Sequence, residues 1–111
     1  QLHTGQDIAN SCGSPIYAAH AGTVIYAGWY SDLGNYIQIR EDDGTVTGYG
    51  HIIDGGILVS IGQHVGPGQN IAKIGSTGGS TGCHLHFQVW VNGSLTDPVP
   101  FMRDRGVTLG S

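Results

Sequence analysis

The sequence predicts an all-β fold, a compact antiparallel β-sheet domain with short turns. Glycine supplies 20 of the 111 residues and charged residues only 11%, so long helices held by surface ion pairs are not expected. No stretch of ten or more residues shows a convincing helical period. Short apolar runs instead alternate with turn-forming clusters. A chain of this length supports one hydrophobic core, so we expect residues 1–111 to form a single domain.

Six apolar runs are the predicted strand regions, in chain order residues 15–30, 34–42, 46–53, 57–65, 70–76 and 85–91. Clusters rich in Gly, Asp, Ser and Asn bound them, at residues 31–35, 42–45, 54–56, 66–69, 76–82 and 92–94. Asp43-Gly44 and Asn92-Gly93 are the strongest hairpin signals. Residues 97–111 contain proline and are expected to extend the domain as coil.

Charge and hydropathy argue against a nucleic-acid partner and against a membrane-spanning segment. Four basic residues stand against eight acidic ones, which gives a net charge of −4 and disfavours a nucleic-acid partner. No apolar run approaches the ~18 residues of a membrane span. Because the first residue is Gln1 and no signal peptide is visible, we expect a mature or excised domain. We expect it to be monomeric.

The chain has two cysteines, Cys12 and Cys83. Buried thiols are one interpretation. A metal-binding role for Cys83 is weakened because, on a strand, its side chain would point away from those of His84 and His86. We favour a Cys12–Cys83 disulfide. It would close a loop of about 70 residues, worth about 4 kcal/mol in the chain-entropy model, and would imply an oxidising compartment.

The run GCHLHFQVW places two histidines in a predicted strand. Because strand side chains alternate, His84, His86, Gln88 and Trp90 share one face, and Leu85, Phe87, Val89 and Val91 share the other, apolar face. The α-carbons of His84 and His86 would lie roughly 6.5 Å apart, close enough to serve one metal ion or a metal and its water. Two solvated histidines on a half-exposed strand are the alternative interpretation.

Three further polar residues complete a candidate site. His3 and Asp7 lie in LHTGQDIAN, which reads as a loop or strand end, and His51 follows VTGYG on a face shared with Thr47 and Tyr49. Each alone reads as a solvated polar residue. Together with His84 and His86 they make a set of four histidines and one carboxylate. Two histidines and the carboxylate could bind a metal ion, and two further histidines would remain beside it. Catalytic zinc uses three protein ligands beside an open position, and nearby histidines can transfer protons.

The segments HTGQD, YGH and GSTGGSTGCHLHFQV resemble those of the lysostaphin-like peptidoglycan endopeptidases, peptidase family M23, also called LytM domains. The resemblance covers nearly the whole chain, including its glycine punctuation. It implies a lysostaphin/LytM-like fold of the duplicated hybrid motif type. It also implies roles for individual residues: zinc ligands His3, Asp7 and His86; catalytic histidines His51 and His84; and cleft-lining residues Asn35 and Tyr49.

The chain departs from the family pattern at two positions, neither of them a metal or catalytic position. Cys83 stands where the family often has proline, and Gln88 where it often has glutamate. The cysteine fits a branch in which a disulfide fastens the HxH strand to the segment after Asp7. The glycine-rich segment GSTGGSTG is expected to be a flexible rim of the substrate groove, and His20 and His64 are expected to be solvated.

The resemblance implies a metallo-endopeptidase with one Zn²⁺ per domain, which hydrolyses peptide cross-links or stem peptides of bacterial peptidoglycan. Such a protein would act outside the cell, at the cell wall or in the periplasm, and could be phage-borne. A catalytically inactive scaffold or wall-binding module of the same fold is the alternative. A histidine phosphocarrier of similar β-architecture is disfavoured, because it has no need for the His3–Asp7 pair and a cytoplasmic carrier would seldom use a disulfide.

Overall fold

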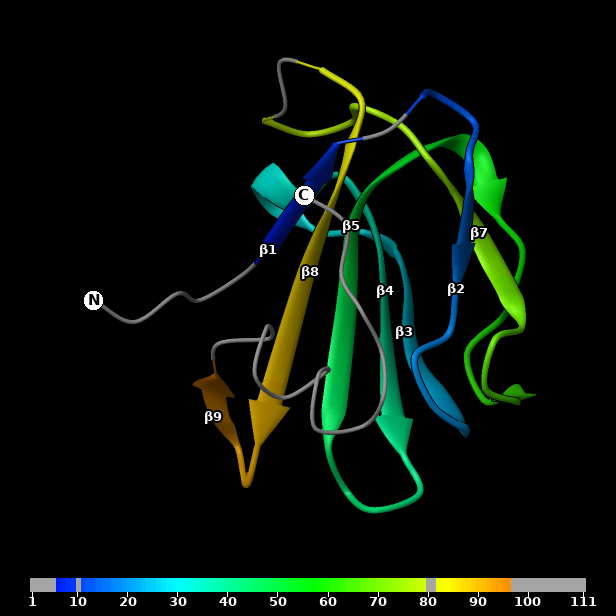
Figure 1. Cartoon of the computed structure of the whole chain (residues 1–111), viewed down its shortest axis with the longest axis vertical. Coiled ribbons are helices and arrows are strands. Elements are labelled where there is room, and N and C mark those ends of the chain that lie inside the picture. Colours follow the sequence, from blue (N-terminus) through cyan, green and yellow to red (C-terminus); the bar gives the residue numbers. More distant parts are fainter. Residues whose placement is uncertain (1–5, 10, 80–81, 97–111) are drawn as a thin grey trace.

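The computed structural model describes residues 6–9, 11–79 and 82–96 (Figure 1). The elements in chain order are β1 (Gln6–Ala9), β2 (Pro15–Tyr17), β3 (Gly22–Trp29), the 3₁₀ turn η1 (Ser31–Leu33), β4 (Asn35–Glu41), β5 (Val46–Ile57), β6 (His64–Val65), β7 (Asn70–Ile74), β8 (His84–Val91) and β9 (Ser94–Thr96). The prediction of an all-β fold is confirmed. Within the described ranges, no helix is long and apolar enough to cross a membrane.

All strand pairs of the described sheet are antiparallel. The main path through the sheet is β1-β8-β5-β4-β3-β6, with β7 joined to both β5 and β2 and with β9 joined to β8. Figure 1 shows β8, β5, β4 and β3 side by side, with the β2–β7 pair at one flank. Because β5 and β8 run antiparallel, the start of β8 lies beside the middle of β5.

Strand β5 changes partner along its length. Its first residues, up to Gly50, pair with β8, where Gly50 is opposite His86. Farther along, Ile52 is opposite Ile74 of β7. Between these two ladders lies His51, whose φ of 62° is in the left-handed region. A non-glycine residue in this region costs about 1–2 kcal/mol, so the strand is locally strained where it leaves β8.

The side chains of β8 alternate as its sequence predicts. Leu85, Phe87 and Val89 are buried, and His84 and His86 between them are half-buried. The Phe87 ring packs against that of Tyr49, with centroids 5.2 Å apart. One face of β8 therefore joins the core and the other carries both histidines. The fully buried core also draws on Val24, Ile37, Ile39, Ile52, Val65 and Ile71.

Both predicted hairpins form. Asn92 and Gly93 both have positive φ, as the two-residue turn between β8 and β9 requires. In the β4–β5 turn, Gly44 has a φ of 90° and the Thr45 amide donates to Asp43 Oδ1 at 2.9 Å. These turns set the register of the strands that carry the histidines.

Four sequence expectations are corrected, refined or lie outside the described residues. The run 15–30 forms two strands, β2 and β3, because the chain bends at residues 19–21. The run 57–65 is not one strand, because β5 ends at Ile57 and only His64–Val65 pairs again, after a turn with Gly62 at positive φ. The N-terminal loop or strand end contains β1. The expected coil at 97–111 lies outside the described residues.

Candidate active site

Three of the five predicted metal-binding and catalytic residues meet in space. The His51 ring from β5 lies 4.7 Å, centroid to centroid, from that of His84, and 6.0 Å from that of His86. His51 is 8% exposed, whereas both β8 histidines are half-buried. Segments more than 30 residues apart in the sequence thus bring these imidazoles into one cluster.

The position of His51 corrects the face that strand alternation predicts for it. Simple alternation would put its ring with Thr47 and Tyr49, on the core face that packs against Phe87. The ring instead lies beside those of His84 and His86, which occupy the opposite face of β8. The left-handed φ of His51 interrupts the alternation, and this turns the side chain to the histidine face.

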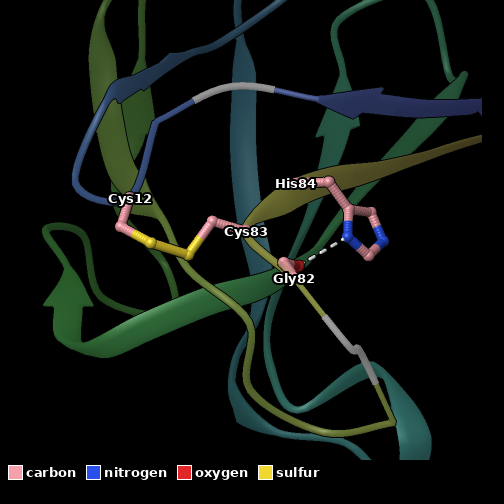
Figure 2. Close-up of a disulfide and its surroundings, with 4 residues drawn as sticks. All are labelled: Cys12, Gly82, Cys83 and His84. Carbon is pink, nitrogen blue, oxygen red and sulfur yellow. Dashed lines mark hydrogen bonds between the residues drawn. A yellow bond between two sulfur atoms is a disulfide. The ribbon is translucent and has the colours of Figure 1, made fainter.

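Hydrogen bonds to main-chain carbonyls orient two of the rings. His51 Nδ1 lies 2.6 Å from the Thr77 carbonyl oxygen. His84 Nδ1 lies 2.9 Å from that of Gly82, as Figure 2 shows. Because a carbonyl oxygen can only accept, each Nδ1 donates. The neutral ring then has its acceptor lone pair on Nε2, the nitrogen that can take a proton or bind a metal.

The predicted zinc ligands are only partly described. His86 belongs to the cluster, and Asp7 is its register partner in the β1–β8 ladder. His3 and the Asp7 side chain lie outside what the structure describes. Among the side chains that it does describe, no three histidine, cysteine or carboxylate groups are arranged to hold a metal ion. The donors suit zinc: an imidazole stands at His86, and the residue opposite it in the ladder is a carboxylic acid.

The two expected cleft-lining residues have different surroundings. Asn35 is half-buried, and its side-chain amide donates to Asp54 Oδ1 at 2.8 Å and to the Ile52 carbonyl at 3.2 Å. Tyr49 is only 1% exposed, and its hydroxyl accepts from the Ala19 amide at 3.1 Å. The expectation that Tyr49 lines the cleft is therefore corrected, because its side chain is enclosed in the core.

Cys12 and Cys83 form the expected disulfide, with their α-carbons 5.3 Å apart (Figure 2). Cys83 directly precedes His84 at the start of β8, and Cys12 follows β1 by three residues. The bridge thus closes the end of the ladder in which Ala9 is opposite His84 and Asp7 is opposite His86. It ties together the two segments that carry predicted metal ligands.

Sequence reasoning missed the role of residues 75–79. This part of the expected flexible rim is hydrogen-bonded to β5. The Gly75 amide donates to the His51 carbonyl at 3.0 Å, and Thr77 Oγ1 donates to the Ile52 carbonyl at 2.6 Å. A β-carbon on Gly75 would collide with the backbone of Ile53. The glycine was the available signal, because a glycine beside a strand marks close backbone approach.

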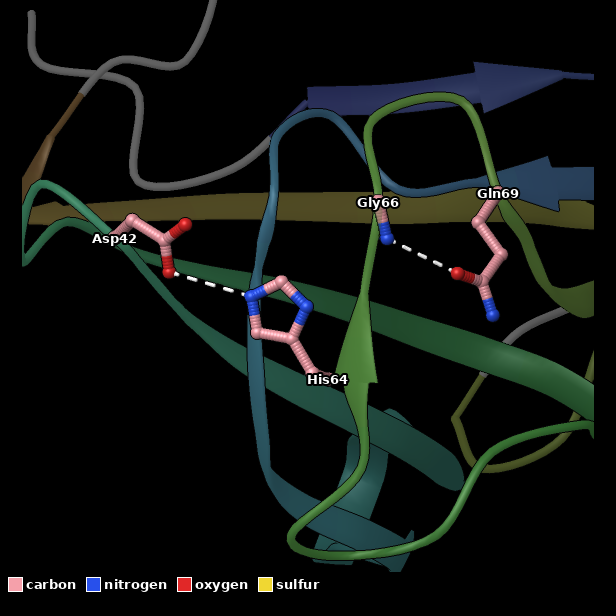
Figure 3. A network of polar contacts seen from close by, with 4 residues as sticks. All are labelled: Asp42, His64, Gly66 and Gln69. Carbon is pink, nitrogen blue, oxygen red and sulfur yellow. Dashed lines mark hydrogen bonds and ion pairs between the residues drawn. The ribbon is translucent and has the colours of Figure 1, made fainter.

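His64 lies apart from this cluster. It is on β6, its side chain is 62% exposed, and it contacts Asp42 at 3.6 Å (Figure 3). Figure 3 also shows the neighbouring turn, which the Gly66 amide closes by donating to Gln69 Oε1 at 3.0 Å. The expectation of a solvated histidine is confirmed for His64, whereas His20 is half-buried.

Comparisons with known proteins agree on one family. The sequence profile described as "Peptidase family M23" matches residues 1–98. The peptidoglycan DD-endopeptidase ShyC of Vibrio cholerae is 38% identical over 98 residues, which cover 88% of this chain and 22% of that protein. Across its most similar curated relatives, the chain spans between 22% and 40% of their length.

Two solved structures show the same fold. The catalytic domain of lysostaphin from Staphylococcus simulans superposes with a TM-score of 0.84 at 37% identity, covering 91% of this chain and 79% of that one. A zinc-containing peptidase from Vibrio cholerae gives a TM-score of 0.79 at 41% identity, covering 86% of this chain and 29% of that one.

Proposed function

Because the chain belongs to peptidase family M23, we propose that it is a zinc metallo-endopeptidase that hydrolyses peptide bonds in the cross-links or stem peptides of peptidoglycan. The observation that carries the proposal is the convergence of three histidines: the centroid of the His51 ring lies 4.7 Å from that of His84 and 6.0 Å from that of His86. A structural role alone gives no reason to gather three imidazoles, two of which are oriented by carbonyl oxygens.

His3, Asp7 and His86 would hold one zinc ion. The β1–β8 register supports two members of this set, because Asp7 is opposite His86 in that ladder. When bound, zinc would polarise the attacking water and lower its pKa toward ~7. The disulfide beside this ladder would keep β1 in place against β8.

His51 and His84 would carry the protons of the reaction. Peptide hydrolysis forms a bond from carbon to the water oxygen, breaks the carbon–nitrogen bond, and moves a proton from water to the departing amine. Both rings donate through Nδ1, so the Nε2 atom of one can accept the water proton. A protonated ring in the pair can then deliver a proton to the amine.

Peptidoglycan is the proposed substrate because one relative is named a peptidoglycan DD-endopeptidase and the catalytic domain of lysostaphin has the same fold. The disulfide supports an oxidising location, outside the cell, at the wall or in the periplasm. We propose that the domain acts as a monomer.

Removal of the metal tests this function. A strong chelator should abolish the release of new amino termini from purified peptidoglycan, and added zinc should restore it, because the nucleophile is a polarised water. Circular dichroism of the chelated protein controls for unfolding. Full activity in protein shown to be zinc-free by elemental analysis would reject the mechanism. One bound zinc without cleavage would favour an inactive, wall-binding relative.

A further inference from the structure

We propose that Thr77 is a positioning residue that holds His51 in the tautomer that proton transfer requires. The catalytic part of this inference rests on the proposed function, whereas its structural part concerns one hydrogen bond. His51 Nδ1 lies 2.6 Å from the Thr77 carbonyl oxygen, so the ring carries its proton on Nδ1 and its acceptor lone pair on Nε2. If that carbonyl moved away, the ring would lose the contact that selects this tautomer.

The side chain of Thr77 fixes the position of its own carbonyl. Its Oγ1 donates to the Ile52 carbonyl at 2.6 Å and accepts from the main-chain amide of Asn35 at 3.1 Å. Ile52 directly follows His51 on β5. Thr77 therefore binds two consecutive residues of this strand, His51 through its main-chain carbonyl and Ile52 through its side-chain hydroxyl. The side-chain amide of Asn35 also belongs to this network, because it donates to the same Ile52 carbonyl at 3.2 Å.

The glycines around Thr77 allow this close approach. The Gly75 amide donates to the His51 carbonyl at 3.0 Å, and the Gly79 amide donates to the Asp32 carbonyl at 2.8 Å. A β-carbon on Gly78 would collide with the Asp32 carbonyl. Residues 75–79 are therefore bound to β5 on one side and to the segment around η1 on the other.

The backbone conformation of His51 explains why contacts from residues 75–77 are needed. Its left-handed φ of 62° is unfavourable for a side chain with a β-carbon, so other contacts must over-determine the conformation. Thr77 and Gly75 supply them: one binds the ring, and the other binds the main-chain carbonyl of the same residue. The hydroxyl of Thr77 is the part of this arrangement that substitution can remove without changing side-chain shape.

The tautomer can be measured directly by NMR. Two-bond ¹⁵N–¹H correlation spectra of protein with ¹⁵N-labelled histidine distinguish the two neutral forms, at about pH 9 where an ordinary imidazole is neutral. We expect wild-type His51 in the zinc-loaded protein to be protonated on Nδ1. Protonation on Nε2 in the wild type overturns the proposal without any variant.

Two substitutions separate the hydroxyl from the shape of the side chain. Thr77→Val removes both Oγ1 hydrogen bonds; it should populate the Nε2–H form of His51 and reduce the cleavage rate about 10- to 100-fold, the usual effect of losing a supporting hydrogen-bond partner. Thr77→Ser keeps the hydroxyl and should restore both the tautomer and the rate. Thr23→Val, on β3 beyond β4, is the matched control and should change neither.

The outcomes are distinct. A Thr77→Val variant that retains zinc, the wild-type tautomer and the wild-type rate overturns the role of Thr77. A Thr77→Ser variant as impaired as Thr77→Val also overturns it, because shape rather than the hydroxyl would then matter. If wild-type protein shows the Nδ1–H form but cleaves no peptidoglycan with zinc bound, the proposed function fails while the structural contact stands.

Discussion

Two histidines that lie two residues apart on β8 have different expected roles. Both rings lie on the half-exposed face of the strand, yet only His86 is opposite Asp7 in the β1–β8 ladder. His84 is nearer to His51, and its Nδ1 is bound to the Gly82 carbonyl. Register and ring contacts thus support a ligand at His86 and a proton carrier at His84.

Substitution of each should give a different defect. His86→Ala removes one of three proposed ligands, so zinc content and cleavage should fall together. His84→Ala should retain about one zinc and lose about 10²-fold or more in turnover, the effect of losing a positioned proton-transfer group. Elemental analysis and the rate of amine release measure both quantities on the same samples.

His64→Ala is the matched control for this pair, because His64 is exposed and lies on β6, away from the cluster. It should keep both zinc and activity. Loss of zinc in His84→Ala with retention in His86→Ala would show that the two roles are reversed.

At the scale of elements, residues 75–79 and β5 depend on one another. The segment approaches β5 so closely that Gly75 has no room for a β-carbon beside the backbone of Ile53. Gly75 is buried, and its amide is bonded to the His51 carbonyl. The placement of His51, the proposed proton carrier, is therefore a property of two elements packed together, not of β5 alone.

Gly75→Ala should displace this segment. Overpacking of this kind typically costs 1–3 kcal/mol, and here it should also lower the cleavage rate because the His51 contacts move with the segment. Gly66→Ala is the control, since nothing lies within 4 Å of a β-carbon there. Urea unfolding and amine release on both variants make the comparison. Equal stability and activity for the two variants would show that the segment yields without cost.

At the scale of the whole molecule, the disulfide links residues 71 apart in the sequence. In the chain-entropy model, a loop of this length is worth about 4 kcal/mol, because the bridge restricts the unfolded chain. The Cys12→Ser/Cys83→Ser double variant should lose about this much free energy of unfolding, as measured by urea titration. Reduced wild-type protein should behave like the double variant. Two free thiols in denatured, unreduced wild type would contradict the bridge.

Buried tyrosines make the fold sensitive to alkali. Burial raises the pKa of Tyr49 to about 12 from an ordinary 10.0, and it also raises that of Tyr36. The folded state holds these protons more tightly than the unfolded state. The stabilising effect of Tyr49 is thus complete below about pH 10 and is lost as the pH rises through about 12, at a cost of about 2–3 kcal/mol.

Tyr49→Phe tests this pH dependence. At neutral pH it should be less stable by about 1 kcal/mol, because the Ala19 amide loses its acceptor. Between pH 10 and 12 its free energy of unfolding should fall less steeply than that of the wild type, with Tyr36 accounting for part of the remaining slope. Parallel curves in urea titrations over this range would exclude Tyr49 as a source of the alkaline sensitivity.

The sequence by itself determined the features that depend on neighbours along the chain. The alternation of β8, the hairpins at Asp43-Gly44 and Asn92-Gly93, and the all-β class follow from period-two patterning and turn chemistry, which are local. The Cys12–Cys83 pairing followed because the chain has no other cysteine.

Only the tertiary structure decided the face of His51, the burial of Tyr49 and the place of Thr77. Each depends on the point at which β5 stops pairing with β8 and begins to pair with β7. This change of partner strand involves residues far apart in the sequence. Alternation predicts the wrong face for His51 because one left-handed residue reverses it, and that conformation is held by contacts from residues 75–77. The sequence therefore indicates which residues form the candidate site, and long-range packing determines how they are arranged.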